Sequence, residues 1–278
     1  MKILLSGAQG MLGQAMTSAL AGHSNIIQYS RAEFDLTCPD QMDRVIRNEQ
    51  PDYIINCAAY TAVDLAEKEE GKAIAINGTG VEKLAQICNQ YSVTLIHFST
   101  DYVFNGAAQH PYPVDAPVDP INAYGNSKLI GENAISRAGG KFYVFRISWL
   151  YAPHGKNFFR WVAESEQSEL NIVDSQTGSP TSALSVADFV KHLVSSDPEQ
   201  YGIYHFTNKG EWTWYAFAKA INNKLQLGKE INAVSEFKTA AKRPAYSVMD
   251  TTRTIQAFNY TIKTIDQALD EVVSHYKN

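Results

Sequence analysis

The chain has 278 residues, of which 45% are hydrophobic, so it can form one large domain or two modest ones around a sizeable core. Its net charge is -5, and acidic and basic residues are interspersed, so it lacks the basic stripe that binding to a nucleic-acid backbone requires. No stretch is apolar over the length that a membrane span needs. Composition and charge therefore argue against nucleic acid and membrane as partners.

Cysteine usage and the first residues bear on location. Cys38, Cys57 and Cys88 lie far apart and include no CxxC pair, which predicts neither a disulfide framework nor a zinc site. The opening "MKILLSG" turns polar at once and lacks the apolar run and cleavage site of a signal peptide. Both observations predict a protein of the reducing cytoplasm.

The first half of the chain alternates short apolar runs with longer stretches of helical period, which is typical of βαβ units. This pattern predicts an α/β fold with a Rossmann-like, doubly wound parallel sheet over residues 1–150, an NAD(P)-binding domain. Taken in chain order, strands are expected at 2–6, 25–30 (the weakest), 53–59, 94–99 and 142–148, and helices at about 10–21, 39–48, 71–91 and 123–137.

The regularity weakens after Trp149, and shorter mixed segments follow. They predict a smaller mixed α/β lobe over residues 151–278, mainly for substrate binding, that closes with an amphipathic helix over 264–276. Ligands of open α/β sheets bind at the carboxyl ends of the strands, so a lobe over that edge would form a cleft. The functional residues are expected there.

A glycine-rich turn, "SGAQGMLG", follows the first predicted strand directly and opens a helix. Gly7, Gly10 and Gly13 let such a turn tighten, while free N–H groups at the helix start favour the oxygens of a pyrophosphate. The spacing is GxxGxxG, so the position between strand and helix carries the prediction of a dinucleotide site. The alternative is a plain strand-to-helix turn.

The end of the second predicted strand bears on cofactor choice. It reads Ser30 and Arg31 where an NAD-selective site usually carries an acidic residue, and a guanidinium and a hydroxyl suit a 2′-phosphate. This favours NADPH, with NADH left open and Arg31 as a solvated surface cation the alternative. Asp35 and Leu36 are candidates to flank the adenine and its ribose.

A tyrosine and a lysine stand four residues apart in "AYGNSK", so Tyr124 and Lys128 share one face of a predicted helix. An ammonium beside a phenol should lower the pKa of the phenol and make Tyr124 a general acid, while Lys128 could also bind the nicotinamide ribose. Ser99 and Thr100 fall at the carboxyl end of the fourth predicted strand, where a hydroxyl could bind the same carbonyl oxygen. The alternatives are a surface pair and a capping threonine.

These features resemble the extended short-chain dehydrogenase/reductase family, with its triad of Ser or Thr, Tyr and Lys. Within that family the chain resembles the branch that reduces the 4-keto group of dTDP-4-dehydro-L-rhamnose to dTDP-L-rhamnose, a precursor in polysaccharide biosynthesis. The resemblance runs almost end to end, through residues 56–69, 99–106, 122–132, 146–152, 176–181, 202–218 and 243–250.

The resemblance implies roles residue by residue. It implies that the catalytic residues are Thr100, Tyr124 and Lys128. Trp149 could stack on the apolar side of a sugar or be a core aromatic, and Arg243 could clamp a pyrophosphate or be a solvated loop arginine. Cofactor contacts are expected at Gly7, Gly10, Met11, Leu12, Gly13, Ser30, Arg31, Asp35, Leu36, Ala59, Tyr60, Thr61, Ser99, Tyr124 and Lys128, and substrate contacts at Thr100, Asp101, Tyr102, Tyr124, Trp149 and Arg243.

Some questions stay open at this stage. His97, inside an apolar strand, is expected to be a satisfied core residue. No carboxylate cluster predicts a metal site, and the resemblance leaves both alternatives open: a homodimer with bound Mg²⁺, as in some relatives, or a protein that acts alone.

Rival functions on the same fold also stay open. A 4,6-dehydratase would carry Glu where this chain has Tyr102. A 4-epimerase would retain its cofactor, and another sugar-nucleotide 4-ketoreductase would reduce a different sugar. A non-enzymatic regulatory subunit resembling the β subunit of methionine adenosyltransferase is the alternative outside enzymes.

Overall fold

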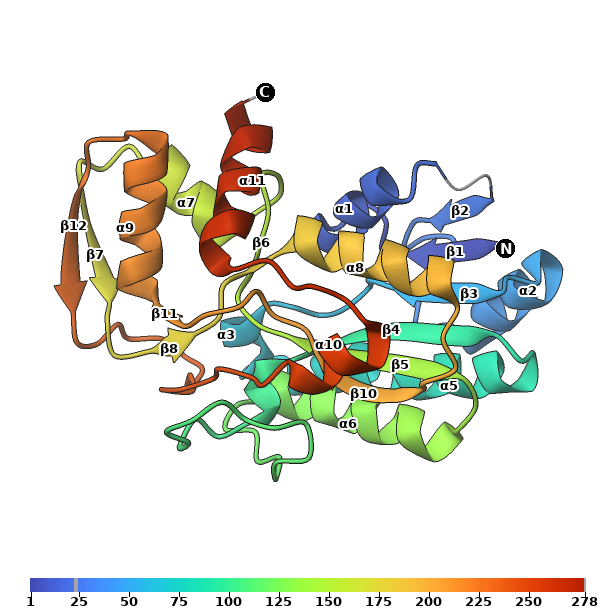
Figure 1. Ribbon diagram of the computed structural model, residues 1–278. Helices are drawn as coiled ribbons and strands as arrows, with labels where there is room; N and C mark the ends of the chain where they lie inside the picture. The colour runs from blue at the N-terminus through green and yellow to red at the C-terminus, as the bar shows by residue number, and fades with distance from the viewer. Residues whose placement is uncertain (23–24, 278) are drawn as a thin grey trace.

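A six-stranded parallel sheet forms the centre of the molecule, which a computed structural model describes over residues 1–22 and 25–277. The strand order is β10-β5-β4-β3-β1-β2, so β1 lies beside the edge strand β2, and the later strands follow in chain order on the other side of β1 (Figure 1). This arrangement confirms the predicted doubly wound α/β fold. The strands are β1 (Ile3–Ser6), β2 (Ile26–Tyr29), β3 (Tyr53–Asn56), β4 (Thr94–Thr100), β5 (Phe142–Ile147) and β10 (Gly202–His205).

Both faces of the sheet are covered by helices, which is why its central strands read as continuous apolar runs. Side chains alternate between the faces, so Ile3 and Leu5 enter one buried cluster and Leu4 enters the other. One face is covered by α1 (Met11–Ala19), α8 (Ala183–Ser196) and α10 (Thr252–Phe258), and the other by α2 (Pro39–Glu49), α5 (Val81–Gln90) and α6 (Ala123–Ala138).

Segments beyond residue 150 complete this sheet. Strand β10 pairs in parallel with β5, and α8 packs beside α1 in the same apolar cluster. The expected division at residue 150 follows the end of β5. It assigns to the second lobe both β10, a strand of the main sheet, and α8, a helix that covers one face of that sheet.

The helix expected over 71–91 contains a change of pitch. It consists of α4 (Glu70–Ile74), a π-helical turn η1 (Ala75–Gly80) and α5. A π-turn inserts one residue into the α-helical ladder and is frequently found at functional sites. Here it buries the side chain of Asn77 beside the cavity described below.

A smaller lobe projects beyond the carboxyl ends of the strands (Figure 1). Its core joins residues such as Phe159, Phe217 and Leu269, and a parallel pair of strands, β7 with β12, lies along its edge. Short pairs β6–β9 and β8–β11 connect it to the sheet. Its elements are β6 (Leu150–Tyr151), α7 (Phe158–Glu164), β7 (Glu169–Val173), β8 (Thr177–Gly178), β9 (Thr181–Ser182), β11 (Trp212–Thr213), α9 (Trp214–Leu225), β12 (Glu230–Val234) and α11 (Ile265–Lys277).

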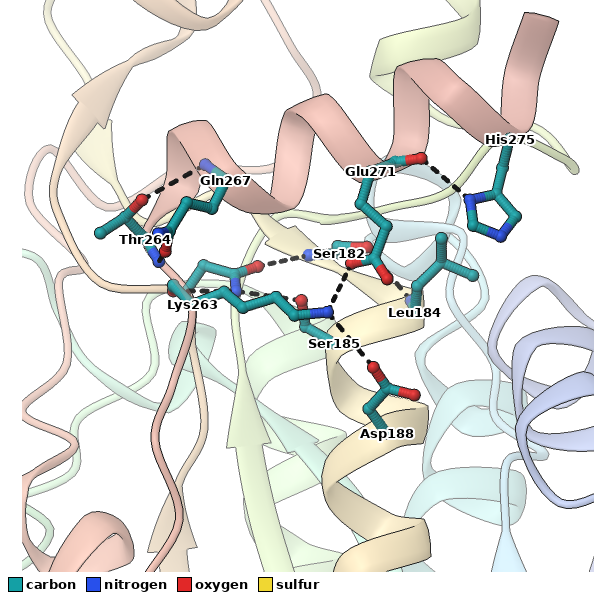
Figure 2. Close-up of polar contacts among 10 residues, drawn as sticks. Ser182, Leu184, Ser185, Asp188, Lys263, Thr264, Gln267, Glu271 and His275 are labelled. Carbon is teal, nitrogen blue, oxygen red and sulfur yellow. Dashed lines mark hydrogen bonds and ion pairs between the residues drawn. The ribbon is translucent and has the colours of Figure 1, made fainter.

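Helix α11 is fixed to the rest of the fold at its first turn (Figure 2). Lys263 donates to Asp188 on α8 at 3.3 Å and to Glu271 on α11 at 2.8 Å. Thr264 and Gln267 exchange side-chain and backbone hydrogen bonds as a capping box. These contacts hold α11 against α8, a helix that covers the main sheet. Within the described residues, no helix is long and apolar enough to cross a membrane.

Candidate active site

The carboxyl edge of the sheet carries a cavity of about 660 Å³, a size that suits a small-molecule ligand. A hollow of about 250 Å³ adjoins it and shares the lining residues Gly10 and Ala59. The predicted residues that line the larger cavity are Gly10, Met11, Leu12, Ala59, Thr61, Ser99, Thr100, Asp101, Tyr102, Tyr124, Lys128 and Trp149, and those that line the hollow include Gly7, Ser30, Arg31, Asp35 and Leu36.

The glycine turn lies between the cavity and the hollow. Gly7 has a φ of 68°, in the left-handed region, and a Cβ on Gly13 would lie 2.2 Å from the Gly7 carbonyl oxygen. The absence of side chains lets α1 start directly against the turn. The first-turn N–H groups of α1, from Met11 onward, have no acceptor within the helix, so they can bind anionic oxygens. Gly13 itself is buried behind the turn and lines neither space.

The hollow has a charged and exposed rim. The Arg31 side chain is 71% exposed and its Nε lies 3.3 Å from Oδ2 of Asp35. Ser30 donates its backbone N–H and its hydroxyl to Glu33. Arg31 can therefore turn toward a phosphate at this rim, while the nearby carboxylates of Glu33 and Asp35 oppose it.

The loop after β3 is fixed by the π-turn of η1. Asn77 accepts a hydrogen bond from the Tyr60 backbone N–H and donates one to the Tyr60 carbonyl, both at 2.9 Å. The Tyr60 ring is buried and its hydroxyl donates to Glu69, so it lines neither space, unlike its neighbours Ala59 and Thr61. Tyr60 itself was expected at the cofactor, and the sequence indicates no role for Asn77.

Helix α6 brings Tyr124 and Lys128 to the same cavity. The helix begins after Asn122, whose side chain caps it by accepting from the Gly125 N–H at 2.7 Å. Ser127, between the two residues, donates to the Tyr124 carbonyl and accepts from Asn77. The cap and the contact with η1 thus fix the start of the helix on which both side chains stand.

The electrostatics differ from the expectation that Lys128 lowers the pKa of Tyr124. Burial, and then the charge of Asp101, raises the pKa of Tyr124 far above its usual value. The Lys128 Nζ donates to the Phe98 carbonyl at 2.6 Å and lies 3.2 Å from His97 Nε2, and burial lowers its pKa to about 8. A phenol that stays protonated at neutral pH is still the form that can give a proton to a carbonyl oxygen.

Three polar side chains meet at the end of β4. Thr100 donates to Asp101 Oδ1 at 3.0 Å and accepts from the Tyr102 N–H at 3.2 Å, so it caps the 3-10 turn η2 (Asp101–Val103). Burial raises the pKa of Asp101 to about 7. The Ser99 hydroxyl is buried and has no hydrogen-bond partner among the described residues, which leaves it free to bind a group in the cavity.

Aromatic rings form the wall toward the smaller lobe. Trp149 has a φ of 46°, which is unusual for a bulky residue, and stacks on Trp214 with ring centroids 3.7 Å apart. Both rings line the cavity. Tyr102 lies edge-on to Tyr124 and also lines a further pocket that holds Arg243.

Arg243 is held in place by an ion pair. Its Nη2 lies 2.9 Å from Oδ2 of Asp64, and the side chain is 25% exposed.

Sequence reasoning could not find Trp214, because nothing in the sequence reveals that α9 begins opposite Trp149. It also gave no role to His154, whose Nε2 lies 2.9 Å from the Met11 carbonyl. Among the described residues, no group of three or more His, Cys, Asp or Glu side chains could hold a metal ion.

The doubly wound sheet, the glycine turn at its edge and the Tyr124–Lys128 pair over one cavity define an extended short-chain dehydrogenase/reductase. Comparison with known proteins narrows the class. The family model described as the RmlD substrate binding domain matches residues 1–278, and the chain belongs to this family.

Relatives agree with this assignment. A dTDP-4-dehydrorhamnose reductase of Burkholderia thailandensis is 37% identical over 268 residues, which cover 90% of each chain. The crystal structure of such a reductase from Clostridium acetobutylicum is 32% identical, covers both chains fully and has a TM-score of 0.96. Another, from Bacillus anthracis in complex with NADP, is 33% identical, covers 99% of this chain and all of the other, and has a TM-score of 0.93.

Proposed function

We propose that the protein reduces the 4-keto group of dTDP-4-dehydro-L-rhamnose to give dTDP-L-rhamnose, with NADPH as hydride donor. The observation that carries the proposal is the placement of Tyr124, Lys128 and Thr100 on one cavity that adjoins the glycine turn. Its support from known proteins is the shared family, relatives named as this reductase, and NADP bound to one of them.

The residues around the cavity suit a nicotinamide dinucleotide. Helix α1 offers its free N–H groups to the pyrophosphate, and the hollow with Leu36 and Arg31 offers an apolar surface and a cation to the adenosine end. The preference for NADPH rests on Arg31, the nearest guanidinium at the rim of the hollow. When bound, the cofactor would supply a hydride to the carbonyl carbon of the sugar.

The chain's own groups act on the carbonyl oxygen. Tyr124 is protonated at neutral pH and gives its proton to that oxygen. The unpartnered hydroxyl of Ser99 can donate to the same oxygen, and that of Thr100 can do so once its proton turns away from Asp101. Lys128 lies one helical turn further and is a candidate to hold the nicotinamide ribose. The stacked rings of Trp149 and Trp214 offer an apolar wall to the sugar nucleotide, and Arg243 a cation to its pyrophosphate.

The rival functions differ in what they need from the site. A 4,6-dehydratase needs an extra acid-base carboxylate, and its position is filled by Tyr102, a phenol whose pKa burial raises to about 12. A non-enzymatic subunit would have no use for Tyr124 and Lys128 over an open cavity. A 4-epimerase would return its cofactor to the starting state, whereas a reductase consumes it.

The decisive experiment is an assay of NADPH oxidation with dTDP-4-dehydro-L-rhamnose, followed by identification of the sugar product. We expect one NADPH oxidised for each dTDP-L-rhamnose formed. Conversion of substrate without net NADPH consumption would show an epimerase instead. In a parallel reaction, dTDP-glucose should stay unchanged, and formation of its 4-keto-6-deoxy product would show a dehydratase.

A further inference from the structure

A row of buried polar side chains crosses the sheet to Lys128. Ser6, Asn56 and His97 lie in register on the neighbouring strands β1, β3 and β4. They follow Leu4, Ile54 and Leu95 by two residues, so they project from the same face of the sheet, toward α6. None of the three is more than 1% exposed, and Lys128 is 2% exposed. The three form a polar stripe in a face that is otherwise apolar.

The hydrogen bonds in this row have a fixed direction. Asn56 Oδ1 accepts from the Ser6 hydroxyl at 2.7 Å and from the Ala58 backbone N–H at 3.1 Å. A backbone N–H can only donate, so the amide cannot be flipped, and Asn56 Nδ2 faces His97 Nδ1 at 3.0 Å as a donor. His97 Nδ1 must then accept, and the network assigns the ring proton to Nε2.

That tautomer points an N–H at the lysine. His97 Nε2 lies 3.2 Å from Lys128 Nζ, and Lys128 donates to the Phe98 carbonyl at 2.6 Å. A neutral amine satisfies every partner, because it accepts from His97 and donates to Phe98. An ammonium has no lone pair, so it would face the His97 proton or force the ring into the tautomer that leaves two N–H groups opposed at Asn56.

We propose that His97 is a positioning residue for Lys128: Asn56 and Ser6 fix its tautomer, so that it holds the lysine nitrogen in place and makes it give up a proton more readily. Among the ionisable groups near Lys128, Glu132 and Tyr124 lie on the same helix and Asp101 of η2 lines the same cavity; Arg146 of β5 pairs with Glu132. From η1, the neutral amide of Asn77 contacts α6 through Ser127.

The protonation states agree with this geometry. Burial, and then the charge of Lys128, lowers the pKa of His97 well below its usual value, so the ring stays neutral. Burial lowers the pKa of Lys128 as well, against the opposing charge of Glu132. A histidine that the sequence identifies only as a satisfied core residue thereby acquires a specific task beside the predicted catalytic pair.

The test reverses the hydrogen bonds that involve His97 and keeps the row of polar side chains. In Asn56→Asp, a carboxylate accepts from His97 Nδ1, so Nε2 becomes an acceptor and favours the lysine ammonium. We expect the alkaline limb of the pH profile of kcat/KM to move up by about one pH unit. NADPH affinity at pH 9, measured by cofactor fluorescence, should weaken less in this variant than in the unchanged protein. An unmoved alkaline limb would overturn the proposal.

Two further measurements guard against misfolding and against failure of the proposed reaction. His97→Gln, whose amide oxygen can face the lysine, should move the limb in the same direction. The matched control is His205→Gln, which alters a buried histidine that contacts Arg146 instead, and it should lower thermal stability without moving the limb.

The ring nitrogens of His97 can also be observed directly, by ¹⁵N NMR of the histidine-labelled protein. We expect the Nε2–H tautomer at neutral pH. Observation of the Nδ1–H tautomer would refute the proposal. Because this measurement needs neither substrate nor turnover, it separates failure of this inference from failure of the proposed reductase function.

Discussion

The two ends of the predicted cofactor groove are built in opposite ways. At the end near Tyr124, polar groups such as Asp101 and Lys128 are buried, and this burial shifts their pKa values strongly. At the rim with Arg31, the charged groups are exposed and pair only with near neighbours in sequence. Buried polar groups act at low dielectric and exposed ones are screened, so the same kind of substitution should have unequal effects at the two ends.

The largest effect is expected at the buried end. Tyr124→Phe removes the phenol proton that Tyr124 gives to the carbonyl oxygen in the proposed reaction, so turnover should fall by roughly 10²–10⁴-fold. NADPH should still bind, as cofactor fluorescence would show. The control is Tyr91→Phe, which removes a tyrosine hydroxyl that donates a hydrogen bond to Asp43 outside the cavity. This variant should retain normal turnover. Near-normal turnover of Tyr124→Phe would remove Tyr124 from the mechanism.

A substitution in the aromatic wall of Trp149 and Trp214 should have an effect of intermediate size. Trp214→Ala removes the ring on which Trp149 stacks, so KM for the sugar nucleotide should rise about tenfold, with a smaller change in kcat. Steady-state kinetics with saturating NADPH measure both. The control is Trp212→Ala, which alters an aromatic residue of the smaller lobe core. If both variants changed KM alike, loss of packing would explain the effect and not contact with the substrate.

The exposed rim should respond more weakly and selectively. Arg31→Ala removes the guanidinium that can reach a 2′-phosphate, so NADPH binding should weaken several-fold, more than NADH binding. Titrations of both cofactors at low and high salt measure this, because an exposed charge is screened by ions. Arg44→Ala, an exposed arginine on α2, controls for net charge. Equal losses for both cofactors would contradict the assignment of Arg31.

The pH dependence of thermal stability should show the effect of the buried carboxyl group of Asp101. The pKa of Asp101 is about 7 in the folded protein against 3.8 for the free side chain. As pH rises from about 4 to 7, Asp101 loses its proton in the unfolded chain but keeps it in the folded protein. The free energy of unfolding therefore falls over this range, and the destabilisation by Asp101 is complete above about pH 7. Asp101→Asn should therefore raise the melting temperature at pH 8 by a few degrees more than at pH 5. The exposed Asp115, changed to Asn, should show no such pH dependence.

The sequence was sufficient for the parts of the fold that local patterns determine. Each predicted strand of the first half lies in the sheet. The central strands were clearest, because a strand buried on both faces has an apolar run that is visible in the sequence, whereas the edge strand β2 is only partly buried and gave the weakest signal. The glycine turn and the Tyr124–Lys128 pair were likewise visible, since each depends on spacing within one segment.

Contacts between distant segments could not be predicted in this way. The pairing of β10 with β5, the stacking of Trp149 on Trp214 and the row from Ser6 to Lys128 all join residues far apart in the chain. The π-turn at Asn77 was missed because the residues on both sides of it are helical, and the sequence was read as one continuous helix. The expected lowering of the Tyr124 pKa by Lys128 was wrong in this structure, because burial and the charge of Asp101 raise that pKa.

Strand β10 has a consequence for biosynthesis of the protein. When a ribosome has released the chain as far as Ile147, β5 still offers a bare hydrogen-bonding edge, and it stays bare until His205 has emerged. Nascent intermediates of this length should be the species most exposed to chaperones and to aggregation. Truncated versions that stop at the end of β5 should accumulate as insoluble material.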